Sequence, residues 1–394
     1  MIGVIADDLT GAAEIGAVGL RHGLRAEIVR HGKPSGMAEV VCVDTDSRSC
    51  APDEAGKRAA EAAKLLRAAG AQWIYKKVDS VLRGQVTAEV EAVMKQLQLN
   101  RALLLPANPS LGRIIRDGQY FVRGQLIHKT EFARDPEYPR RASHVLRLLK
   151  PPAQFLIRLA NGDHSLADGT IVVGEAASPE DVRGWARRCA AEMLPAGGSE
   201  FFSALLDASF PGAPASCRQD TSLTDSQPAG RMPALPGREL FVCGTFTEAS
   251  RKFVSAARRR KTPVFSLPQE LAWGGELSVS VAEAIAQRVT TAYDGHRRVI
   301  LNVGLPPVRN MAVARRLSYF VVQVAELVLR RVAIANVFAE GGATAAELVR
   351  RMGWARLAVQ REHAPGVATL AVEGSQSILL TIKPGTYAWP AQWT

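Results

Sequence analysis

Short apolar runs alternate with stretches of helical periodicity in the N-terminal half of the chain. Apolar-rich runs of strand length cover residues 2–6, 40–44, 73–79 and 102–107. Small and apolar residues recur at helical spacing between them, over residues 11–22, 53–69 and 85–97. Strands that alternate with helices in this way are typical of a parallel sheet with helices on its faces.

The C-terminal half repeats this alternation after a stretch of different composition. Residues 195–237 are rich in Pro, Gly, Ser and Ala, which predicts an inter-domain linker. Strands are predicted after it at 239–244, 262–267, 298–304, 335–342 and 377–382, with helices at 249–260, 279–292 and 311–331. We therefore predict an α/β protein that has two α/β domains with mainly parallel sheets and a cleft between them.

Length and charge narrow the class of protein. The chain has 394 residues, which favours two domains. Its formal charge is +11 and its pI is about 9.7, a balance that suits small anions such as phosphates, nucleic acid or a membrane surface. Most of the arginines are scattered over helical stretches, and the one compact basic run, 258–261, is interpreted as a solvated helix end.

Cysteine usage and hydropathy indicate a cytoplasmic protein. The five cysteines form no CxxC pair and match no zinc-site spacing, and Cys42 and Cys243 lie in apolar runs typical of a core. The chain begins with a strand-like run followed by acids rather than with a leader. The longest apolar tract, 317–339, contains charges that favour a buried helix and strand. We expect no membrane partner.

Four predicted strands of the N-terminal half end on polar side chains of both charges. These are Asp7, Asp8, Thr10 and Gly11 after the first strand, Asp44 to Arg48 after the second, Lys77, Asp79, Ser80 and Arg83 at the end of the third, and Asn108 and Arg113 after the fourth. Ligands of such sheets bind at the carboxyl ends of the strands. Lys and Arg suit a carboxylate, while Asp and Ser suit hydroxyls, so the pattern predicts a pocket for a hydroxyl-rich anion.

Strand alternation refines this pocket. Lys77 and Asp79 share a face with Trp73 and Tyr75, so they are expected to point the same way at the end of the strand. An acid beside a hydroxyl can also take its proton when that hydroxyl attacks phosphorus.

Structural interpretations of the same residues stay open. Thr10 could be only a helix N-cap, with Asp8 a partner of the helix dipole. Asp79 and Arg83 could form an internal salt bridge that supports the turn, and residues 44–48 could be loop chemistry alone. His128 follows a glycine turn as a pocket candidate, although a structural role is the favoured interpretation.

Three glycine-containing turns in the C-terminal half predict a nucleotide site. They carry Thr245, Thr247 and Ser250, then Gly341, Gly342, Ala343 and Thr344, and finally Gly385. Backbone amides at a strand-to-helix turn suit phosphate oxygens, although a tight turn also explains residues 341–344. The chain has neither a GxxxxGK[ST] loop nor a GxGxxG motif, so these turns do not form a P-loop or a dinucleotide fingerprint.

The segments ADDLTGA at 6–12, DTDSR at 44–48, KKVDSVLRG at 76–84 and the stretch 106–136 resemble the four-carbon acid-sugar kinase family. The resemblance covers nearly the whole N-terminal half in the family's order. On either side of the predicted linker at 195–237, it implies a sugar-acid-binding domain at 1–194 and a nucleotide-binding domain at 238–394. It also implies activity on threonate, erythronate or 3-oxo-tetronate acids.

The resemblance assigns residues to two sites. It implies that the sugar-acid site is lined by Asp7, Asp8, Lys77, Asp79, Ser80 and Arg83. It places ATP at Thr245 and Thr247, at Gly341, Gly342, Ala343 and Thr344, and near Gly385. One of Asp7, Asp8 or Asp79 is expected to accept the proton of the attacking hydroxyl, with Asp8 preferred, and no metal ligand is predicted.

The nucleotide loops depart from the family pattern, which leaves more than one hypothesis. Ala343 stands where the family's glycine loop carries an acid. We expect an ATP-dependent kinase of a small, four-carbon-like sugar acid, with Mg²⁺ on the phosphates and closure of the two domains excluding water. The alternative is a degenerate member that senses a sugar acid or nucleotide. A nucleic-acid binder ranks last because no binding motif is present. Whether the chain forms a homo-oligomer is left open.

Overall fold

The computed structural model describes residues 1–135, 137–150, 154–161, 167–208, 237–273, 275, 277–305, 311–374, 378–385 and 387–394. The chain divides into two compact units, Met1–Asp220 and Thr221–Thr394. The strands of each unit are described by themselves.

The sheet of the first unit is parallel. Its strand order is β2 (Ala26–Val29), β3 (Val40–Asp44), β1 (Ile2–Ala6), β4 (Trp73–Lys77), β11 (Met193–Gly197), β5 (Arg101–Leu105), β10 (Thr170–Gly174) and β9 (Leu156–Ala160). Every neighbouring pair in this order runs parallel. The central strands are buried along their whole length, which is why they appear in the sequence as continuous apolar runs.

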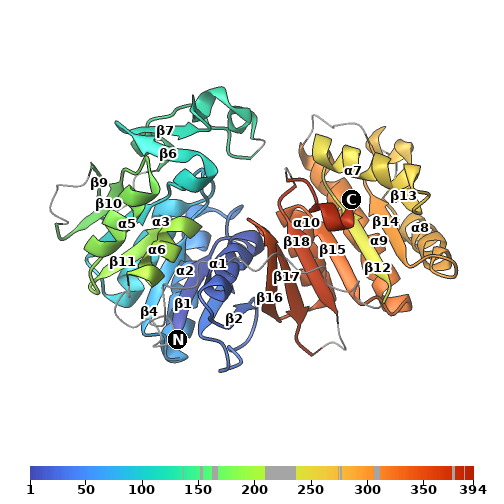
Figure 1. Cartoon of the computed structure of the whole chain (residues 1–394), viewed down its shortest axis with the longest axis horizontal. Coiled ribbons are helices and arrows are strands. Elements are labelled where there is room, and N and C mark those ends of the chain that lie inside the picture. Colours follow the sequence, from blue (N-terminus) through green and yellow to red (C-terminus); the bar gives the residue numbers. More distant parts are fainter. Residues whose placement is uncertain are drawn as a thin grey trace. The chain divides into compact units, whose positions relative to one another are not determined.

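Small residues bring the helices of this unit close to its sheet and to each other. Helix α1 (Leu9–Arg21) packs on β1, β2 and β3 and contacts α6 (Ser199–Asp207), which in turn contacts α5 (Pro179–Arg188). A Cβ on Gly19 would meet Val40 at 3.0 Å. Helices α2 (Pro52–Ala68) and α3 (Val86–Leu97) pack against each other (Figure 1).

A small antiparallel sheet interrupts the first unit after β5. It consists of β6 (Arg113–Arg116), β7 (Gln119–Val122) and β8 (Gln125–Leu126), flanked by η1 (Pro109–Leu111), η2 (Ile127–Lys129), η3 (Glu131–Arg134) and α4 (Val145–Leu148). Figure 1 shows β6 and β7 outside the main sheet. We call residues 109–148 the insertion. Its strands are short and half-buried, so they carry little of the apolar signal that predicted the main strands.

The second unit has a mixed sheet. Its order is β13 (Val264–Ser266), β14 (Arg298–Asn302), β12 (Glu239–Cys243), β15 (Asn336–Glu340), β18 (Leu379–Lys383), β17 (Val367–Val372) and β16 (Arg356–Ala364). Neighbours from β13 to β18 are parallel, whereas β16, β17 and β18 pair antiparallel. Helices α8 (Val279–Ala292), α9 (Met311–Arg331) and α10 (Gly342–Met352) pack in sequence order, and α7 (Glu248–Arg259) contacts β13.

An aromatic cluster forms part of the core of the second unit. Phe241 of β12 stacks on Phe338 of β15 with ring centroids 4.1 Å apart, and Trp389 meets both rings edge-on. Phe253 of α7 and Cys243 pack in the same cluster. Cys243 and Cys42 are fully buried, so both cysteines are core residues as predicted.

The α/β class with mainly parallel sheets is confirmed, with two differences in detail. Helix α1 begins at Leu9 rather than at residue 11. The predicted linker is wrong over its first residues, because β11 ends at Gly197 and α6 extends to Asp207. A Cβ on Gly197 would collide with the carbonyl oxygen of Leu105, so this glycine serves strand packing rather than a linker.

The rest of the predicted linker, from residue 209 to residue 236, lies outside the described residues. The cleft between the domains stays a prediction. Among the residues that the structure describes, no helix is both long and apolar enough to cross a membrane.

Candidate functional site

Asp7 and Asp8 follow β1 at the point where the strand order of the first unit reverses. The chain places β3 on one side of β1 and then β4 on the other. Crevices at such reversals, outside the carboxyl ends of the strands, are where parallel sheets bind ligands. The two acids therefore lie where the fold most favours a site.

Arg48 pairs with both acids. Its guanidinium donates to the two oxygens of Asp7, at 2.7 Å from Nε and 2.9 Å from Nη2, and its Nη1 donates to Asp8 Oδ2 at 2.6 Å. Burial works to raise the pKa of Asp7, but Arg48 outweighs burial and the pKa lies below its ordinary value. Asp7 is therefore an ionised, buried partner of Arg48.

Asp8 has a different environment from Asp7. It is the N-cap of α1 and accepts a hydrogen bond from the backbone N of Gly11 at 2.7 Å. The alternative interpretation of Thr10 as the cap does not hold, since Thr10 lies inside the helix. The Asp8 side chain is 21% exposed, against 4% for Asp7. Burial raises its pKa above the ordinary value although Arg48 opposes this. Of this pair, Asp8 is the acid better suited to take up a proton.

Asp79 and Arg83 form the internal salt bridge that the sequence left as an alternative. Arg83 donates to Asp79 from Nη2 at 2.8 Å, from Nε at 3.0 Å and from its backbone N at 3.1 Å. Its Nη1 donates to Asp135 of the insertion at 3.2 Å. Burial opposes ionisation of Asp79, yet Arg83 and Arg48 hold its pKa well below the ordinary range. Asp79 is thus a poor proton acceptor.

The two lysines of β4 point to opposite faces of the sheet. Lys77 Nζ lies 3.2 Å from Glu14 of α1 and donates to the carbonyl oxygen of Val78 at 2.8 Å. Lys76 Nζ lies 2.8 Å from Glu89 of α3. The alternation predicted for this strand is correct. Lys77 and Asp79 nevertheless have different partners, and the Lys77 side chain is only 3% exposed.

The insertion holds the loops of this site in place. Arg113 Nη1 and the hydroxyl of Tyr120 donate to Ser80, to its Oγ and its carbonyl oxygen respectively. The hydroxyl of Tyr138 donates to the carbonyl oxygen of Arg48, and Arg140 donates to that of Leu82 at 3.1 Å. Sequence reasoning missed these contacts, because they depend on a small sheet that the apolar pattern did not reveal.

Most side chains of the loop after β3 hold the loop against neighbouring elements. Thr45 Oγ1 donates to the carbonyl oxygen of Ala6 at 2.9 Å, and Ser47 Oγ donates to Glu89 at 2.6 Å. Asp44 lies 2.8 Å from Nε of Arg30. Arg48 is the residue of this loop whose side chain contacts the carboxylates after β1, a role that the sequence analysis did not assign to it.

Two further candidates have structural partners. His128 Nδ1 lies 2.7 Å from Ser143 Oγ, which agrees with the structural interpretation of this histidine. Asn108 Nδ2 donates to Ser199 Oγ at 3.2 Å. The first contact lies within the insertion, and the second ties the residue that precedes the insertion to the start of α6.

The three glycine turns of the second unit meet around Thr245. Cβ atoms added to Gly341 or Gly385 would each lie 2.7 Å from Cγ2 of Thr245. Thr247, the N-cap of α7, donates from Oγ1 to the carbonyl oxygen of Gly385 at 2.8 Å. Gly341 has a φ of +98°, a backbone conformation that favours glycine. The turns that the sequence singled out are therefore brought together.

The side chains after Gly341 differ in accessibility. Thr344 is buried, and a Cβ on Gly244 would collide with its hydroxyl, so Thr344 shapes the loop. Ala343 is exposed at the start of α10.

A buried ion pair that the sequence analysis passed over lies beneath these turns. Glu340 ends β15 and Lys383 ends β18, with Lys383 Nζ 3.2 Å from Glu340 Oε2 and both side chains fully buried. Thr245 donates to Glu340 Oε1 at 2.5 Å, and Lys383 donates to the carbonyl oxygen of Tyr387 at 2.7 Å. The sequence did contain a signal for this pair, because Glu340 and Lys383 each end an apolar run. A charge is buried in such a place only when it has a partner.

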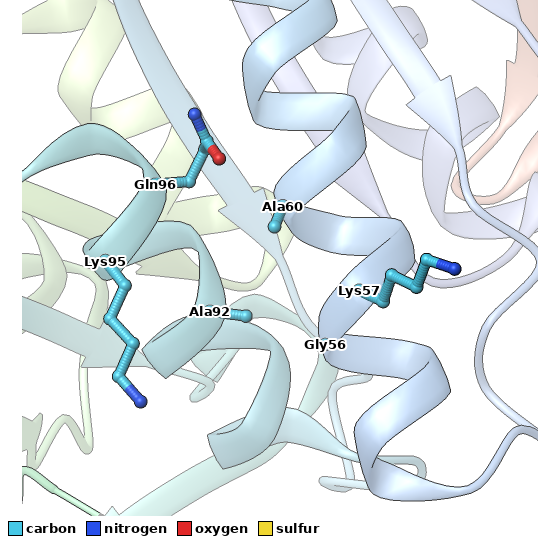
Figure 2. Close-up of a pocket in the computed structure, with 6 residues that line it drawn as sticks. All are labelled: Gly56, Lys57, Ala60, Ala92, Lys95 and Gln96. Carbon is cyan, nitrogen blue, oxygen red and sulfur yellow. The ribbon is translucent and has the colours of Figure 1, made fainter.

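An open groove of about 350 Å³ lies between α2 and α3 (Figure 2). It is lined by Gly56, Lys57, Ala60, Ala92, Lys95 and Gln96. None of the predicted site residues lines it, so the groove and the acidic cluster after β1 are separate features.

Two family models match the chain, a sugar-binding N-terminal domain over residues 2–205 and a nucleotide-binding C-terminal domain over residues 240–387. The chain belongs to the four-carbon acid-sugar kinase family.

Curated relatives and solved structures agree with this family. A 3-oxo-tetronate kinase of Pseudomonas savastanoi is 26% identical over 98% of this chain and 94% of its own length. A D-threonate kinase of Bordetella bronchiseptica is 33% identical over 47% of this chain and 49% of its own. A crystal structure of a Haemophilus influenzae protein has a TM-score of 0.73 at 21% identity, covering 99% of this chain and 98% of that one, which shows the same fold.

Proposed function

We propose that this protein is an ATP-dependent kinase that phosphorylates a hydroxyl of a small, four-carbon-like sugar acid. The observation that carries the proposal is the contrast between Asp7 and Asp8, which share Arg48. One acid is buried and held ionised, while the other is partly open and has a raised pKa. That pairing supplies a fixed charge and a proton acceptor at the strand ends.

The proton acceptor in this proposal is Asp8. A substrate hydroxyl oxygen attacks the γ-phosphorus of ATP, the bond from that phosphorus to the β–γ bridging oxygen breaks, and ADP leaves with the electron pair. The hydroxyl proton passes to the carboxylate of Asp8. Arg83, which is 30% exposed, is the proposed partner of the substrate carboxylate. Asp7, Lys77, Asp79 and Ser80 shape this site through the contacts described above.

The glycine turns around Thr245 are the proposed ATP site. Small residues allow the backbone amides of these turns to approach phosphate oxygens. Thr247, Gly341, Gly342 and Gly385 belong to the same cluster, together with exposed Ala343 and buried Thr344. Support comes from the meeting of the three turns and from the match to a nucleotide-binding domain model.

Mg²⁺ is proposed only as a partner of the ATP phosphates. The described residues contain no group of three His, Cys, Asp or Glu side chains suited to a metal ion. Glu340, the acid nearest the glycine turns, is fully buried and bonded to Lys383 and Thr245. These residues do not fit a protein-built metal site, and Mg²⁺ commonly binds through phosphates and water.

The proposal is tested by incubating the protein with Mg-ATP and D-threonate, D-erythronate or 3-oxo-tetronate while ADP is followed. Acid-dependent ADP release is the expected result. ATP binding by calorimetry without turnover of any acid would favour the sensor alternative, which Ala343 motivated. Absence of ATP binding would contradict the proposed nucleotide site.

A further inference from the structure

Glu14 of α1 is held by side chains from two other elements of the first unit. Its Oε1 accepts a hydrogen bond from Ser199 Oγ, at the start of α6, at 2.6 Å. Its Oε2 lies 3.2 Å from Lys77 Nζ at the end of β4. Ser199 in turn accepts a hydrogen bond from Asn108, after β5, at 3.2 Å. The orientation of the carboxylate is therefore fixed through both of its oxygens.

Glu14 is also ionised and partly open. Burial works to raise its pKa, but Lys77 and Ser199 outweigh burial, so the pKa of Glu14 lies below its ordinary value. The side chain is 24% exposed, in contrast to 3% for Lys77. A carboxylate accepts about four hydrogen bonds. Ser199 and Lys77 use one position on each oxygen, so the carboxylate can accept more.

Glu14 and the proposed base lie along the same side of α1. A Cβ on Gly11 would lie 2.8 Å from Asp8 Oδ1 and 3.8 Å from Lys77 Nζ, so Asp8 and Lys77 flank this glycine. Lys77 then pairs with Glu14. A polyhydroxy acid that presents one hydroxyl to Asp8 would bring a neighbouring hydroxyl towards Glu14.

From this arrangement, which rests on the proposed function, we propose that Glu14 determines specificity by accepting a hydrogen bond from a substrate hydroxyl that is not phosphorylated. A rigid, charged acceptor discriminates strongly against an analogue that lacks the matching hydroxyl, because the acceptor then loses its partner. Glu14 thereby selects the acid by the position and configuration of its hydroxyls.

The test pairs Glu14→Gln with deoxy substrates. We measure kcat and KM for the acid and for ATP with D-threonate, D-erythronate and their 2-deoxy and 3-deoxy analogues. Glu14→Gln is expected to lower kcat/KM at least about tenfold for the full acids, mainly through KM of the acid. KM for ATP stays within about twofold. For the one deoxy analogue that lacks the hydroxyl contacted by Glu14, kcat/KM is expected to be the same in Glu14→Gln as in the wild type.

Controls separate specificity from folding. Glu61→Gln on the exposed face of α2 is the matched control and leaves all constants unchanged. Ser199→Ala keeps the charge of Glu14 and removes one of its orienting contacts, so it should reproduce part of the effect if Glu14→Gln does not fold. An equal loss for the full acids and both deoxy analogues would overturn the proposal, as would no loss at all.

Calorimetry of acid binding in the absence of ATP distinguishes failure of the kinase proposal from failure of the proposed role of Glu14. If the wild type binds an acid without turnover, the kinase proposal fails, and weaker binding in Glu14→Gln that depends on one hydroxyl still supports the role of Glu14. If the wild type binds none of these acids, the role of Glu14 is contradicted as well.

Discussion

At the scale of single residues, one arginine gives two neighbouring acids different properties. Arg48 uses two donors for Asp7 and one for Asp8, and Asp7 is the more buried acid. The carboxyl group of Asp7 therefore stays ionised, while the pKa of Asp8 is raised. Proton acceptors work best when their pKa approaches the working pH, so this division favours Asp8 as the base.

Asp8→Asn is predicted to lower kcat at least about a hundredfold, because the amide cannot accept the proton. Asn is also a good N-cap, so α1 should retain its start and the protein its thermal stability. Steady-state kinetics and thermal unfolding check both points. Asp53→Asn, an exposed acid in the first turn of α2, is the control. Turnover near that of the wild type would exclude Asp8 as the base.

The pH profile gives a second prediction for the same residues. The base must be ionised, so kcat/KM falls as the pH drops through the raised pKa of Asp8. Arg48 lowers that pKa, so Arg48→Gln is predicted to move the acid limb to higher pH, whereas Arg48→Lys keeps it nearer its place. Exposed Arg67→Gln is the control. If the acid limb of the pH profile stayed in place in Arg48→Gln, the group that titrates there would not be Asp8.

At the scale of elements, the apolar pattern predicted β1, β3, β4 and β5 and the helices α1, α2 and α3, but it missed β11, which is buried along its whole length. Strand β11 was missed because Pro195 and Gly197 resemble linker composition, although Gly197 is needed beside Leu105. The contact between Arg48 and Asp7 was missed for another reason. It depends on a loop in which Asp46 takes a φ of +47° and Arg48 N donates to the Asp7 carbonyl oxygen at 3.2 Å.

The loops that the strand-end rule singled out in the first unit nevertheless lie together, as the contacts of Arg48 with Asp7 and Asp8 show. Parallel strands bring their carboxyl ends to one edge, whatever the side chains do there. The rule cannot say which side chains satisfy one another, as Asp79 and Arg83 do. That choice depends on rotamers and on the insertion, whose short strands leave no clear periodicity.

In the second unit, the contributions of Glu340 and Lys383 to the free energy of unfolding should depend on each other. Glu340→Gln or Lys383→Met each leave one buried charge unpaired and are predicted to cost about 3–5 kcal/mol of unfolding free energy. The double variant should cost clearly less than the sum, because neither charge remains. Urea unfolding of the full chain measures all three. Additive losses would contradict a direct interaction.

The packing of the glycine turns gives a further prediction. Gly244→Ala places a Cβ against the hydroxyl of Thr344 and should displace the turn at Thr245, raising KM for ATP about tenfold or more. Gly295→Ala meets nothing within 4 Å and serves as the control. Binding of the sugar acid, measured by calorimetry, should be unchanged in both variants. A normal KM for ATP in Gly244→Ala would place the nucleotide elsewhere.

At the scale of the whole molecule, the two units divide the proposed reaction between them. The first unit carries the acids and cations suited to a sugar acid, and the second carries the glycine turns suited to phosphates. The net charge of +11 is consistent with two anionic substrates, although the distribution of side chains at the strand ends is the stronger argument. In the proposed reaction, a phosphoryl group passes from a ligand of the second unit to a ligand of the first.

Phosphorus NMR of the full reaction tests that transfer most directly. The purified protein is incubated with Mg-ATP and each of the three tetronate acids, with Asp8→Asn in parallel. We predict that at least one acid yields a new phosphomonoester signal, equal in amount to the ADP formed, and that Asp8→Asn lacks this signal on the same time scale. ADP that appears only with inorganic phosphate, or no ADP with any of the acids, would contradict the account.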